Sequence, residues 1–235
     1  MMSDCFINAD ERIDEFEGLK VIQKITGPQF SVDAVLLAKF VSIRKGDIVA
    51  DLGTGGGIIS LILASRTEAE RITAVEIQNE LADITRRNIV LNNLESKIEV
   101  IEADLILAKE HFPSGQFDVV VSNPPYRLIG SGRLNPNSLK AIARHEIKCT
   151  LDDVLKSAFY LLKEHGKLAL VYRPDRLVDL IAGCRRNNLE PKRIQFVYPS
   201  IDREANLVLL EAMKNGNKET KVLNPLILES HNIID

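Results

Sequence analysis

From residue 46 onward, short apolar runs alternate with longer runs of helical periodicity, and this alternation constrains the fold more than any other feature of the chain. Short apolar runs bounded by turn residues predict buried strands, and the segments between them predict helices. The predicted strands are residues 47–52, 71–77, 97–102, 117–122, 167–172, 191–198 and 205–213. Alternating strands and helices predict an α/β protein with a mostly parallel, seven-stranded sheet and helices on both faces.

The last two predicted strands, residues 191–198 and 205–213, depart from this alternation because the connection between them is too short for a helix. Strands joined in this way pair in antiparallel fashion, so we expect an antiparallel C-terminal hairpin. The domain is expected to span residues 19–213. A polar, partly flexible N-terminal extension over residues 1–18 precedes it, and a C-terminal tail over residues 214–235 follows it.

Two further segments lie between the predicted strands. Residues 127–148 form a long predicted loop, and a long loop in a compact domain is usually functional or disordered. Thr150 precedes Asp153 by three residues, which is the spacing of a capping box at the start of a helix. We expect this helix to run to about residue 164, because Gly166 ends it.

The net charge of −3 is not that of a typical nucleic-acid-binding protein, but the charges are unevenly distributed. Residues 1–126 contain 12 Lys and Arg against 20 Asp and Glu, a net charge of −8. Residues 127–203 contain 15 against 8, a net charge of +7, and residues 204–235 contain 3 against 5. A basic half favours an anionic partner such as nucleic acid, with a solvated mixed surface as the alternative. Candidates for phosphate contacts are Arg127, Arg133, Lys140, Arg185, Arg186, Lys192 and Arg193.

Cysteine usage and hydropathy bound the cellular setting. Cys5, Cys149 and Cys184 are far apart and odd in number, which argues against a disulfide framework or a zinc site and for a reducing compartment. No apolar run reaches membrane-spanning length, and the acidic N-terminus has no signal-peptide pattern. We therefore expect a cytoplasmic protein without a metal or a membrane partner.

Polar residues follow four of the predicted parallel strands. They are the segment 51–57, Glu76, Asp104 and the segment 123–126. In open α/β sheets ligands bind beyond the carboxyl ends of the strands, so these residues are expected to converge on one crevice. This convergence is the strongest indication of a functional site that the residues themselves give.

The segment 51–57 joins a strand to a helix and carries Gly53, Gly55 and Gly57 after Asp51. Glycines let the backbone approach a ligand closely, and the N-terminus of the helix offers N–H groups to a carboxylate. The alternating spacing differs from the G-x-G-x-x-G of dinucleotide-binding proteins, which disfavours an NAD-dependent oxidoreductase. Glu76 ends the next strand, where a carboxylate can bind both hydroxyls of a ribose. The pattern predicts a cofactor that contains a nucleoside.

Asp104 has two interpretations. It ends the third strand and can accept a hydrogen bond from an adenine amine, or it can cap the helical segment that follows.

The fourth strand stops at Asn123-Pro124-Pro125-Tyr126. Each proline lacks a backbone N–H and restrains the residue before it, so the strand ends in a stiff loop whose carbonyls at Asn123 and Pro124 need partners from elsewhere. Together with the Asn123 amide and the flat ring of Tyr126, these carbonyls form a cradle suited to a planar group that carries an NH2. A rigid turn with a capping Asn is the alternative.

Taken together, these motifs resemble the signature of Rossmann-like class I methyltransferases that use S-adenosyl-L-methionine. The resembling residues are Asp51, Gly53, Gly55, Gly57, Glu76, Asp104 and the segment Asn123-Pro124-Pro125-Tyr126. The Asn-Pro-Pro-Tyr form is similar to that of the branch that methylates planar nitrogens, namely adenine or guanine amines in nucleic acids, or glutamine amides in proteins. Residues 29–38, 143–146 and 190–197 further resemble bacterial tRNA(Val) adenine-37 N6-methyltransferases of the small-domain type, and the likeness covers residues 19–213.

The resemblance implies roles for these residues. Asn123, Pro124, Pro125 and Tyr126 are expected to be catalytic, with Asn123 and the Pro124 carbonyl accepting the two N–H groups of an adenine amine and Tyr126 stacking on the base. The residues expected to bind S-adenosyl-L-methionine are Asp51, Gly53, Gly55, Gly57, Glu76, Asp104 and Asn123.

The resemblance also implies a substrate, which is the N6 amine of an adenine in the anticodon loop of a tRNA, at position 37 of tRNA-Val. By the same resemblance, Phe30, Ser31 and Asp33 are expected to close over the cofactor, with a helix cap and a buried Phe as the alternative. An N5-glutamine methyltransferase acting on a protein such as a release factor, a methyltransferase of another RNA or DNA base amine, and a non-catalytic cofactor-binding module remain alternatives.

Overall fold

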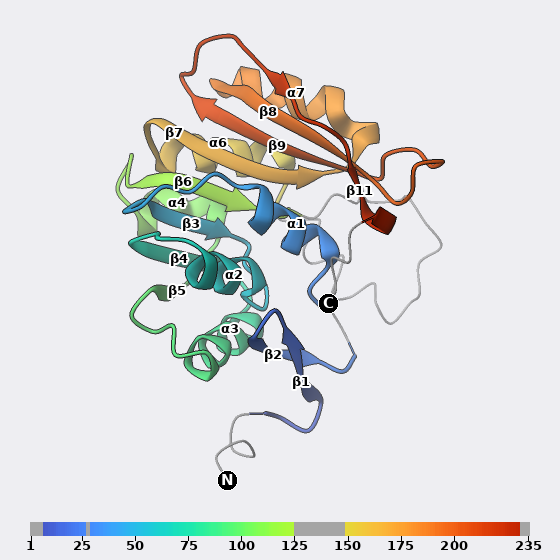
Figure 1. Cartoon of the computed structure of the whole chain (residues 1–235). Helices are drawn as coiled ribbons and strands as arrows, with labels where there is room; N and C mark the ends of the chain where they lie inside the picture. The colour runs from blue at the N-terminus through green and yellow to red at the C-terminus, as the bar shows by residue number, and fades with distance from the viewer. Residues whose placement is uncertain (1–6, 27–28, 125–148, 231–235) are drawn as a thin grey trace.

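A computed structural model describes residues 7–26, 29–124 and 149–230 of the chain. Its centre is one large twisted sheet, which Figure 1 shows edge to edge with helices in front of it and behind it. Within the described residues the sheet has seven long strands and two short ones, in the order β10-β8-β9-β7-β6-β3-β4-β5, with β11 also paired to β8. The strands are β3 (Ile48–Leu52), β4 (Arg71–Glu76), β5 (Ile98–Glu102), β6 (Phe117–Ser122), β7 (Leu162–Tyr172), β8 (Leu189–Tyr198), β9 (Leu207–Lys214), β10 (Lys221–Val222) and β11 (Leu226–Ile227).

The direction of the strands confirms the predicted fold class. Strands β3 to β7 pair in parallel, whereas β9 is antiparallel to both of its neighbours, β7 and β8. The predicted seven strands are therefore present, and the last two form the predicted antiparallel hairpin. The short strands β10 and β11 come from the tail and pair in parallel with β8.

Helices cover both faces of the sheet, as predicted from the alternation of strands and helices. Side chains that alternate along the central strands divide between two cores: Val49, for example, faces α1 and α2, whereas Ala50 and Leu52 face α6 and α7. The helices are α1 (Val32–Phe40), α2 (Ile58–Arg66), α3 (Asn79–Leu91), α4 (Ala108–His111), α6 (Leu151–Leu161) and α7 (Leu177–Arg186), with short 3-10 turns η1 (Leu105–Leu107), η2 (Pro174–Arg176) and η3 (Leu228–Ser230). None of the helices in the described part of the chain is long and apolar enough to cross a membrane.

Helix α6 begins where the sequence predicts and ends about one turn before the predicted end at residue 164. The Thr150 side chain accepts from the backbone of Asp153 and the Asp153 carboxylate accepts from the backbone of Thr150, so the capping box is formed. The helix stops at Leu161, and strand β7 starts at Leu162 rather than after Gly166. Leu162 pairs with Phe117 of β6, and both side chains are fully buried in the core on the α6 and α7 side of the sheet. The free energy gained by this burial outweighs that of another turn of helix.

The N-terminal segment contains a hairpin. The apolar residues of segment 19–25 predict its second strand, whereas the polar composition of residues 1–18 concealed the first. Strands β1 (Glu11–Phe16) and β2 (Leu19–Lys24) form a separate two-stranded antiparallel sheet. Glu17 and Gly18 both have positive φ, which is the backbone of a tight hairpin turn whose twist matches the flanking strands. Figure 1 shows this hairpin beside α3, at the end of the molecule opposite to β8 and α7.

Candidate active site

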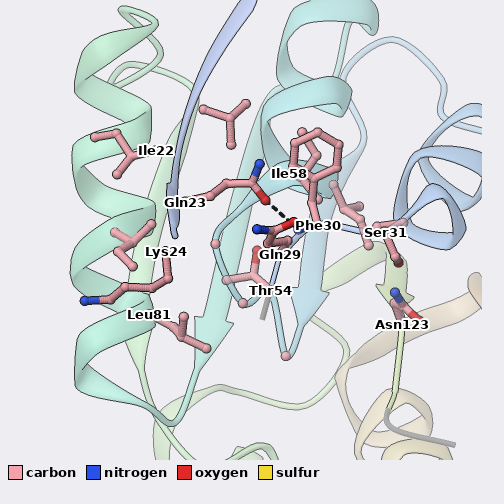
Figure 2. Close-up of a pocket in the computed structure, with 17 residues that line it drawn as sticks. Ile22, Gln23, Lys24, Gln29, Phe30, Ser31, Thr54, Ile58, Leu81 and Asn123 are labelled. Atoms are coloured by element: carbon pink, nitrogen blue, oxygen red, sulfur yellow. Dashed lines mark hydrogen bonds between the residues drawn. The ribbon is translucent and has the colours of Figure 1, made fainter. Parts of the chain in front are cut away.

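The carboxyl ends of β3, β4 and β6 lie side by side, since β3 pairs with β4 on one side and with β6 on the other. This register brings the predicted residues at those ends, Asp51, Glu76 and Asn123, to one edge of the sheet. A cavity of about 150 Å³ opens there (Figure 2). It is lined by Val21, Ile22, Gln23, Lys24, Gln29, Phe30, Ser31, Ala34, Gly53, Thr54, Gly55, Gly56, Ile58, Ile59, Leu81, Ile84 and Asn123.

The glycine loop, residues 53–57, has the backbone that the sequence predicted. Gly53, Gly55 and Gly57 have φ values of 73°, 59° and 88°, a region that residues with a side chain rarely adopt. At Gly57 an added Cβ would lie 2.8 Å from Cγ2 of Thr85, so this position excludes a side chain on steric grounds as well. At Gly53 and Gly55 an added Cβ would meet no atom of the described residues within 4 Å, because both glycines border the cavity.

Helix α3 fixes the glycine loop from outside. The Thr85 hydroxyl donates to the Gly55 carbonyl at 2.7 Å, and the Asn88 side-chain amide donates to the Gly56 carbonyl at 2.9 Å. Both side chains are fully buried. Since a buried carbonyl must be paired, these two bonds hold the loop in one conformation.

Asp51 is completely buried at the end of β3. Its Oδ2 accepts hydrogen bonds from the hydroxyls of Thr54 at 2.6 Å and Ser60 at 2.8 Å. Its Oδ1 has no hydrogen-bond partner among the residues that the structure describes. Burial raises the pKa of Asp51 to about 6, because desolvation disfavours the charged form.

Glu76 is the last residue of β4 and is 5% exposed. Like Asp51, it is not among the residues that line the cavity. Its Oε2 accepts from the backbone N–H of Gly55 at 2.9 Å, and its Oε1 accepts from the backbone N–H of Gln78, also at 2.9 Å. The carboxylate therefore ties the glycine loop to the start of α3. Oε1 also accepts from the side-chain amide of Gln78 at 3.3 Å, so it is Oε2 that keeps a further acceptor site for a ligand hydroxyl.

Asp104 lies beyond β5 and caps the turn η1, with Oδ1 accepting from the backbone N–H of Ile106 at 2.9 Å. This is the capping interpretation that competed with a ligand contact. Asp104 is not among the residues that line the cavity. Its proposed contact with an adenine amine stays a prediction.

The Asn-Pro-Pro-Tyr motif is described in part. Asn123 is half-buried and lines the cavity, and Pro124 is buried. The preceding Ser122 anchors the end of β6 through a 2.8 Å hydrogen bond from its hydroxyl to the Leu52 carbonyl of β3. Pro125 and Tyr126 lie outside the described residues, as do Ala143 to Glu146.

Sequence reasoning missed one side of the cavity. Residues 21–24 of β2 line it, and the Gln23 Oε1 accepts from the backbone N–H of Phe30 at 2.7 Å, which holds the segment before α1 against the hairpin (Figure 2). Phe30 and Ser31 line the cavity, whereas Asp33 does not. The apolar residues of segment 19–25 predict a short strand here, but the local pattern does not show that this strand borders the cavity.

Several candidate phosphate contacts have partners within the protein, and their contact with phosphate stays a prediction. Arg193 donates to the Ser42 hydroxyl, lies 3.3 Å from the Glu211 carboxylate and stacks on Phe40 at 4.7 Å. Arg185 pairs with Glu190 at 2.7 Å, and the Lys192 ammonium donates to the Asn217 carbonyl. Arg186 is exposed, and Arg127, Arg133 and Lys140 lie outside the described residues.

Comparison with known proteins agrees with this geometry. The family model of the methyltransferase small domain matches residues 31–178. A tRNA1(Val) (adenine(37)-N6)-methyltransferase from Parabacteroides distasonis is 32% identical over 181 residues, which are 76% of this chain and 74% of that protein.

Solved structures show the same fold. A predicted O-methyltransferase from Agrobacterium tumefaciens is 28% identical, with a TM-score of 0.67 over 84% of this chain and 88% of its own. TYW2 from M. jannaschii, solved in complex with AdoMet, is 16% identical and shares the fold with a TM-score of 0.59 over 87% of this chain and 85% of its own. The chain therefore belongs to the methyltransferase small domain family and is a methyltransferase of Rossmann-like fold.

Proposed function

We propose that this protein transfers a methyl group from S-adenosyl-L-methionine to the exocyclic N6 amine of an adenine in tRNA, with position 37 of tRNA-Val as the target. One observation carries the proposal: Asn123 lines the same cavity as Gly53, Thr54, Gly55 and Gly56. A group that accepts hydrogen bonds from an amine thus borders the loop expected to hold the cofactor. The names of the curated relatives support tRNA as the substrate.

The residues around the cavity fit S-adenosyl-L-methionine. The buried Oδ1 of Asp51 is an acceptor that suits the α-ammonium group of the methionine part. Glu76 is positioned to accept from the ribose hydroxyls, and Gly53 and Gly55 leave open space beside the loop. Asp104 is proposed to accept from the adenine amine. When bound, the cofactor supplies an electrophilic methyl group on a positively charged sulfur.

The motif at the end of β6 makes the amine a better nucleophile. An adenine amine is weakly nucleophilic because its lone pair is delocalised into the ring. The Asn123 side-chain oxygen and the Pro124 carbonyl accept its two N–H groups, which pulls the nitrogen toward a pyramidal shape. Prolines 124 and 125 keep these acceptors stiff, so positioning and preorganised hydrogen bonds provide the catalysis.

Tyr126 and the substrate complete the proposal. Tyr126 is proposed to stack on the adenine once the base has left its neighbours. A base in the single-stranded anticodon loop requires little energy to extrude, which favours this location. The basic segment of residues 127–203 supports an anionic partner, and a tRNA substrate implies that the enzyme acts in the cytoplasm.

One assay tests the function. The protein is incubated with labelled S-adenosyl-L-methionine and either unmodified total tRNA or release factor, and the methylated product is identified by mass spectrometry. We expect label on N6 of a tRNA adenine and none on the release factor. Label on a glutamine of the protein substrate alone would overturn the proposal.

A further inference from the structure

The N-terminal hairpin contributes to the cavity although it lies outside the large sheet. Val21, Ile22, Gln23 and Lys24 of β2 line the cavity opposite the glycine loop. A two-stranded hairpin has little stability of its own, so its place depends on what it is attached to.

Helix α3 provides that attachment through two asparagines. Asn88 accepts from the Ile22 backbone N–H at 2.6 Å and donates to the Ile22 carbonyl at 3.2 Å, so its amide acts as the edge of a neighbouring strand. Asn92 makes the same pair of bonds with Lys20, at 2.9 and 2.7 Å. Four residues of helix rise about 6 Å and two residues of strand about 6.6 Å, so the two amides match the repeat of β2.

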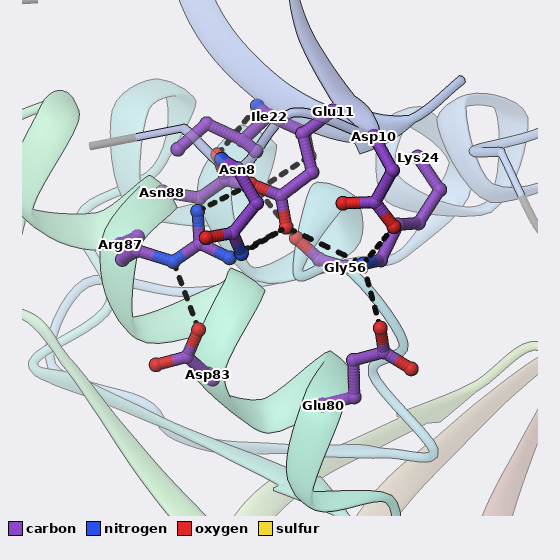
Figure 3. A network of polar contacts seen from close by, with 10 residues as sticks. All are labelled: Asn8, Asp10, Glu11, Ile22, Lys24, Gly56, Glu80, Asp83, Arg87 and Asn88. Carbon is purple, nitrogen blue, oxygen red and sulfur yellow. Dashed lines mark hydrogen bonds and ion pairs between the residues drawn. The ribbon is translucent and has the colours of Figure 1, made fainter. Parts of the chain in front are cut away.

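Asn88 differs from Asn92 in one respect. Its Nδ2 also donates to the Gly56 carbonyl at 2.9 Å, so a single buried amide bonds both walls of the cavity (Figure 3). Asn92 instead donates to the Asn88 carbonyl within the helix and has no bond to the glycine loop. Lys20 does not line the cavity, whereas Ile22 does.

An ion-pair cluster fastens the outer strand of the hairpin to the same helix. The Glu11 side chain of β1 is fully buried and forms a two-pronged pair with Arg87, at 2.7 and 2.8 Å. Arg87 is oriented by Asp83 at 2.9 Å, and Lys24 of β2 reaches Glu80 of α3 at 2.6 Å (Figure 3). A buried carboxylate needs such a partner, and the hydrogen bond from Arg87 lowers the pKa of Glu11 to about 2.

We propose that the β1–β2 hairpin is a wall of the cofactor site and that Asn88 is the positioning residue that sets its distance from the glycine loop. The inference rests on the proposed use of S-adenosyl-L-methionine. Asn88 does not contact the reacting atoms; it holds Ile22 and Gly56 where the cofactor meets them. Loss of this link weakens cofactor binding and leaves the chemical step intact once the cofactor is bound.

Titration calorimetry with S-adenosyl-L-methionine tests the role of Asn88. Asn88→Asp keeps an acceptor for the Ile22 N–H and loses both donated bonds, so we expect the Kd to rise about tenfold. The matched control is Asn92→Asp, which loses the equivalent bond donated to the hairpin, at the Lys20 carbonyl, and has no bond to the glycine loop. Its Kd should stay within about threefold. An equal rise in both variants, or no rise in a folded Asn88→Asp protein, would overturn the inference.

Steady-state kinetics separates positioning from chemistry. We expect Asn88→Asp to raise the KM for S-adenosyl-L-methionine about tenfold while kcat at saturating cofactor changes less than about twofold. A fall in kcat with an unchanged KM would contradict the positioning role. If the wild-type protein itself does not bind S-adenosyl-L-methionine, the proposed function fails, which is a different result from equal binding by wild type and variant.

A second pair of variants decides the matter if Asn88→Asp does not fold. Arg87→Met keeps the stem of the side chain and removes the pair with Glu11, whereas Arg86→Met makes the same change one residue away, at an exposed arginine 3.8 Å from Glu102. We expect about a fivefold rise in Kd for Arg87→Met and less than about twofold for Arg86→Met. Equal affinities in these two variants would show that the hairpin is not part of the site.

Discussion

The hydroxyl of Ser60 donates a 2.8 Å hydrogen bond to Oδ2 of Asp51, which joins the first turn of α2 to the end of β3. The same oxygen accepts from Thr54, so one half of the carboxylate is satisfied inside the protein. The other half, Oδ1, is buried without a partner among the described residues. A buried carboxylate in this state destabilises the folded protein, and a cationic ligand would relieve the cost.

Asp51→Asn should therefore stabilise the ligand-free protein and at the same time weaken cofactor binding. The Asn side-chain oxygen can still accept from Thr54 and Ser60, while the buried charge is gone. We expect the ligand-free variant to be more stable than wild type by about 1 to 3 kcal/mol at neutral pH, and the Kd for S-adenosyl-L-methionine to rise about tenfold or more. Thermal unfolding with and without the cofactor measures both effects. A less stable variant with normal binding would show that Oδ1 is not a ligand contact.

The stability effect of Asp51 should depend on pH. Burial raises its pKa to about 6, so the folded protein binds more protons than the unfolded chain between about pH 4 and pH 6. The destabilisation therefore develops as pH rises through this window and is fully present above it. We expect the difference in Tm between Asp51→Asn and wild type to be small near about pH 4 and largest above about pH 6.5.

Wild type and Asp51→Asn share all other titrating groups, so the difference between their Tm values reports the titration of Asp51 alone. Glu11 acts in the opposite sense, because its pKa is lowered to about 2 and its stabilisation is lost only as pH falls toward that value. A difference in Tm that shrinks as pH rises would contradict the assignment of Asp51.

Glu76 is expected to contribute to cofactor binding in two ways, by holding the glycine loop in place and by contacting the ligand. Glu76→Gln keeps one acceptor oxygen, so one of the two N–H groups of Gly55 and Gln78 loses its partner. We expect the Kd for S-adenosyl-L-methionine to rise about tenfold, measured by calorimetry. Glu102→Gln is the matched control, because Glu102 pairs with Glu76 in register on β5 and is exposed. A similar rise in the control would indicate a general effect of negative charge.

Asn123→Ala should lower turnover and spare the cofactor. The variant removes one of the two acceptors proposed for the adenine amine, so we expect kcat to fall about a hundredfold or more. The Kd for S-adenosyl-L-methionine should change by less than about threefold. Turnover of tRNA methylation and calorimetric binding are the two measurements. Asn79→Ala, at the exposed start of α3, serves as control. Near-normal turnover in the Asn123 variant would refute its proposed role as an acceptor for the adenine amine.

Gly57→Ala should destabilise the protein more than a glycine substitution at an open turn. Its φ of 88° disfavours a side chain, and the new Cβ would lie 2.8 Å from Thr85, which holds the Gly55 carbonyl. We expect a loss of about 3 kcal/mol in the free energy of unfolding. Gly46→Ala has a similar φ of 83° with no neighbour within 4 Å, so its loss should be about 1 kcal/mol. Urea unfolding measures the free energy of unfolding of both variants. Equal losses would show that the Thr85 side chain moves away from the new Cβ at little cost.

The fold and half of the site followed from local sequence patterns. Periodicity and turn residues lie close together along the chain, so they predicted the sheet, its antiparallel hairpin and the strand ends that carry Asp51, Glu76 and Asn123. The predicted helix extended past Leu161 because no local signal records that Leu162 pairs with Phe117. Arg193 was a candidate for a phosphate contact, and its partners within the protein, Ser42 and Glu211, could not be predicted because they are distant in sequence.

The hairpin wall was not predictable for the same reason. Asn88 stands in the middle of a polar, amphipathic helix, and nothing near it in the sequence shows that its amide is buried against Ile22 and Gly56. Glu11 appears in a run of charged residues that is typical of a solvated segment, yet Arg87 makes it a buried anchor. Contacts between residues more than sixty positions apart determine this part of the cavity.

Strands β10 and β11 have a consequence for how the protein behaves in concentrated solution. They cover β8 with two short parallel pairings, at Arg193 and Ile194 and at Val197 and Tyr198, and so occupy hydrogen-bonding groups of an outermost strand. Uncovered outer strands recruit strands from other molecules. We therefore expect the tail to limit self-association, and a chain cut before Lys221 to aggregate more readily because it exposes the unpaired edge of β8.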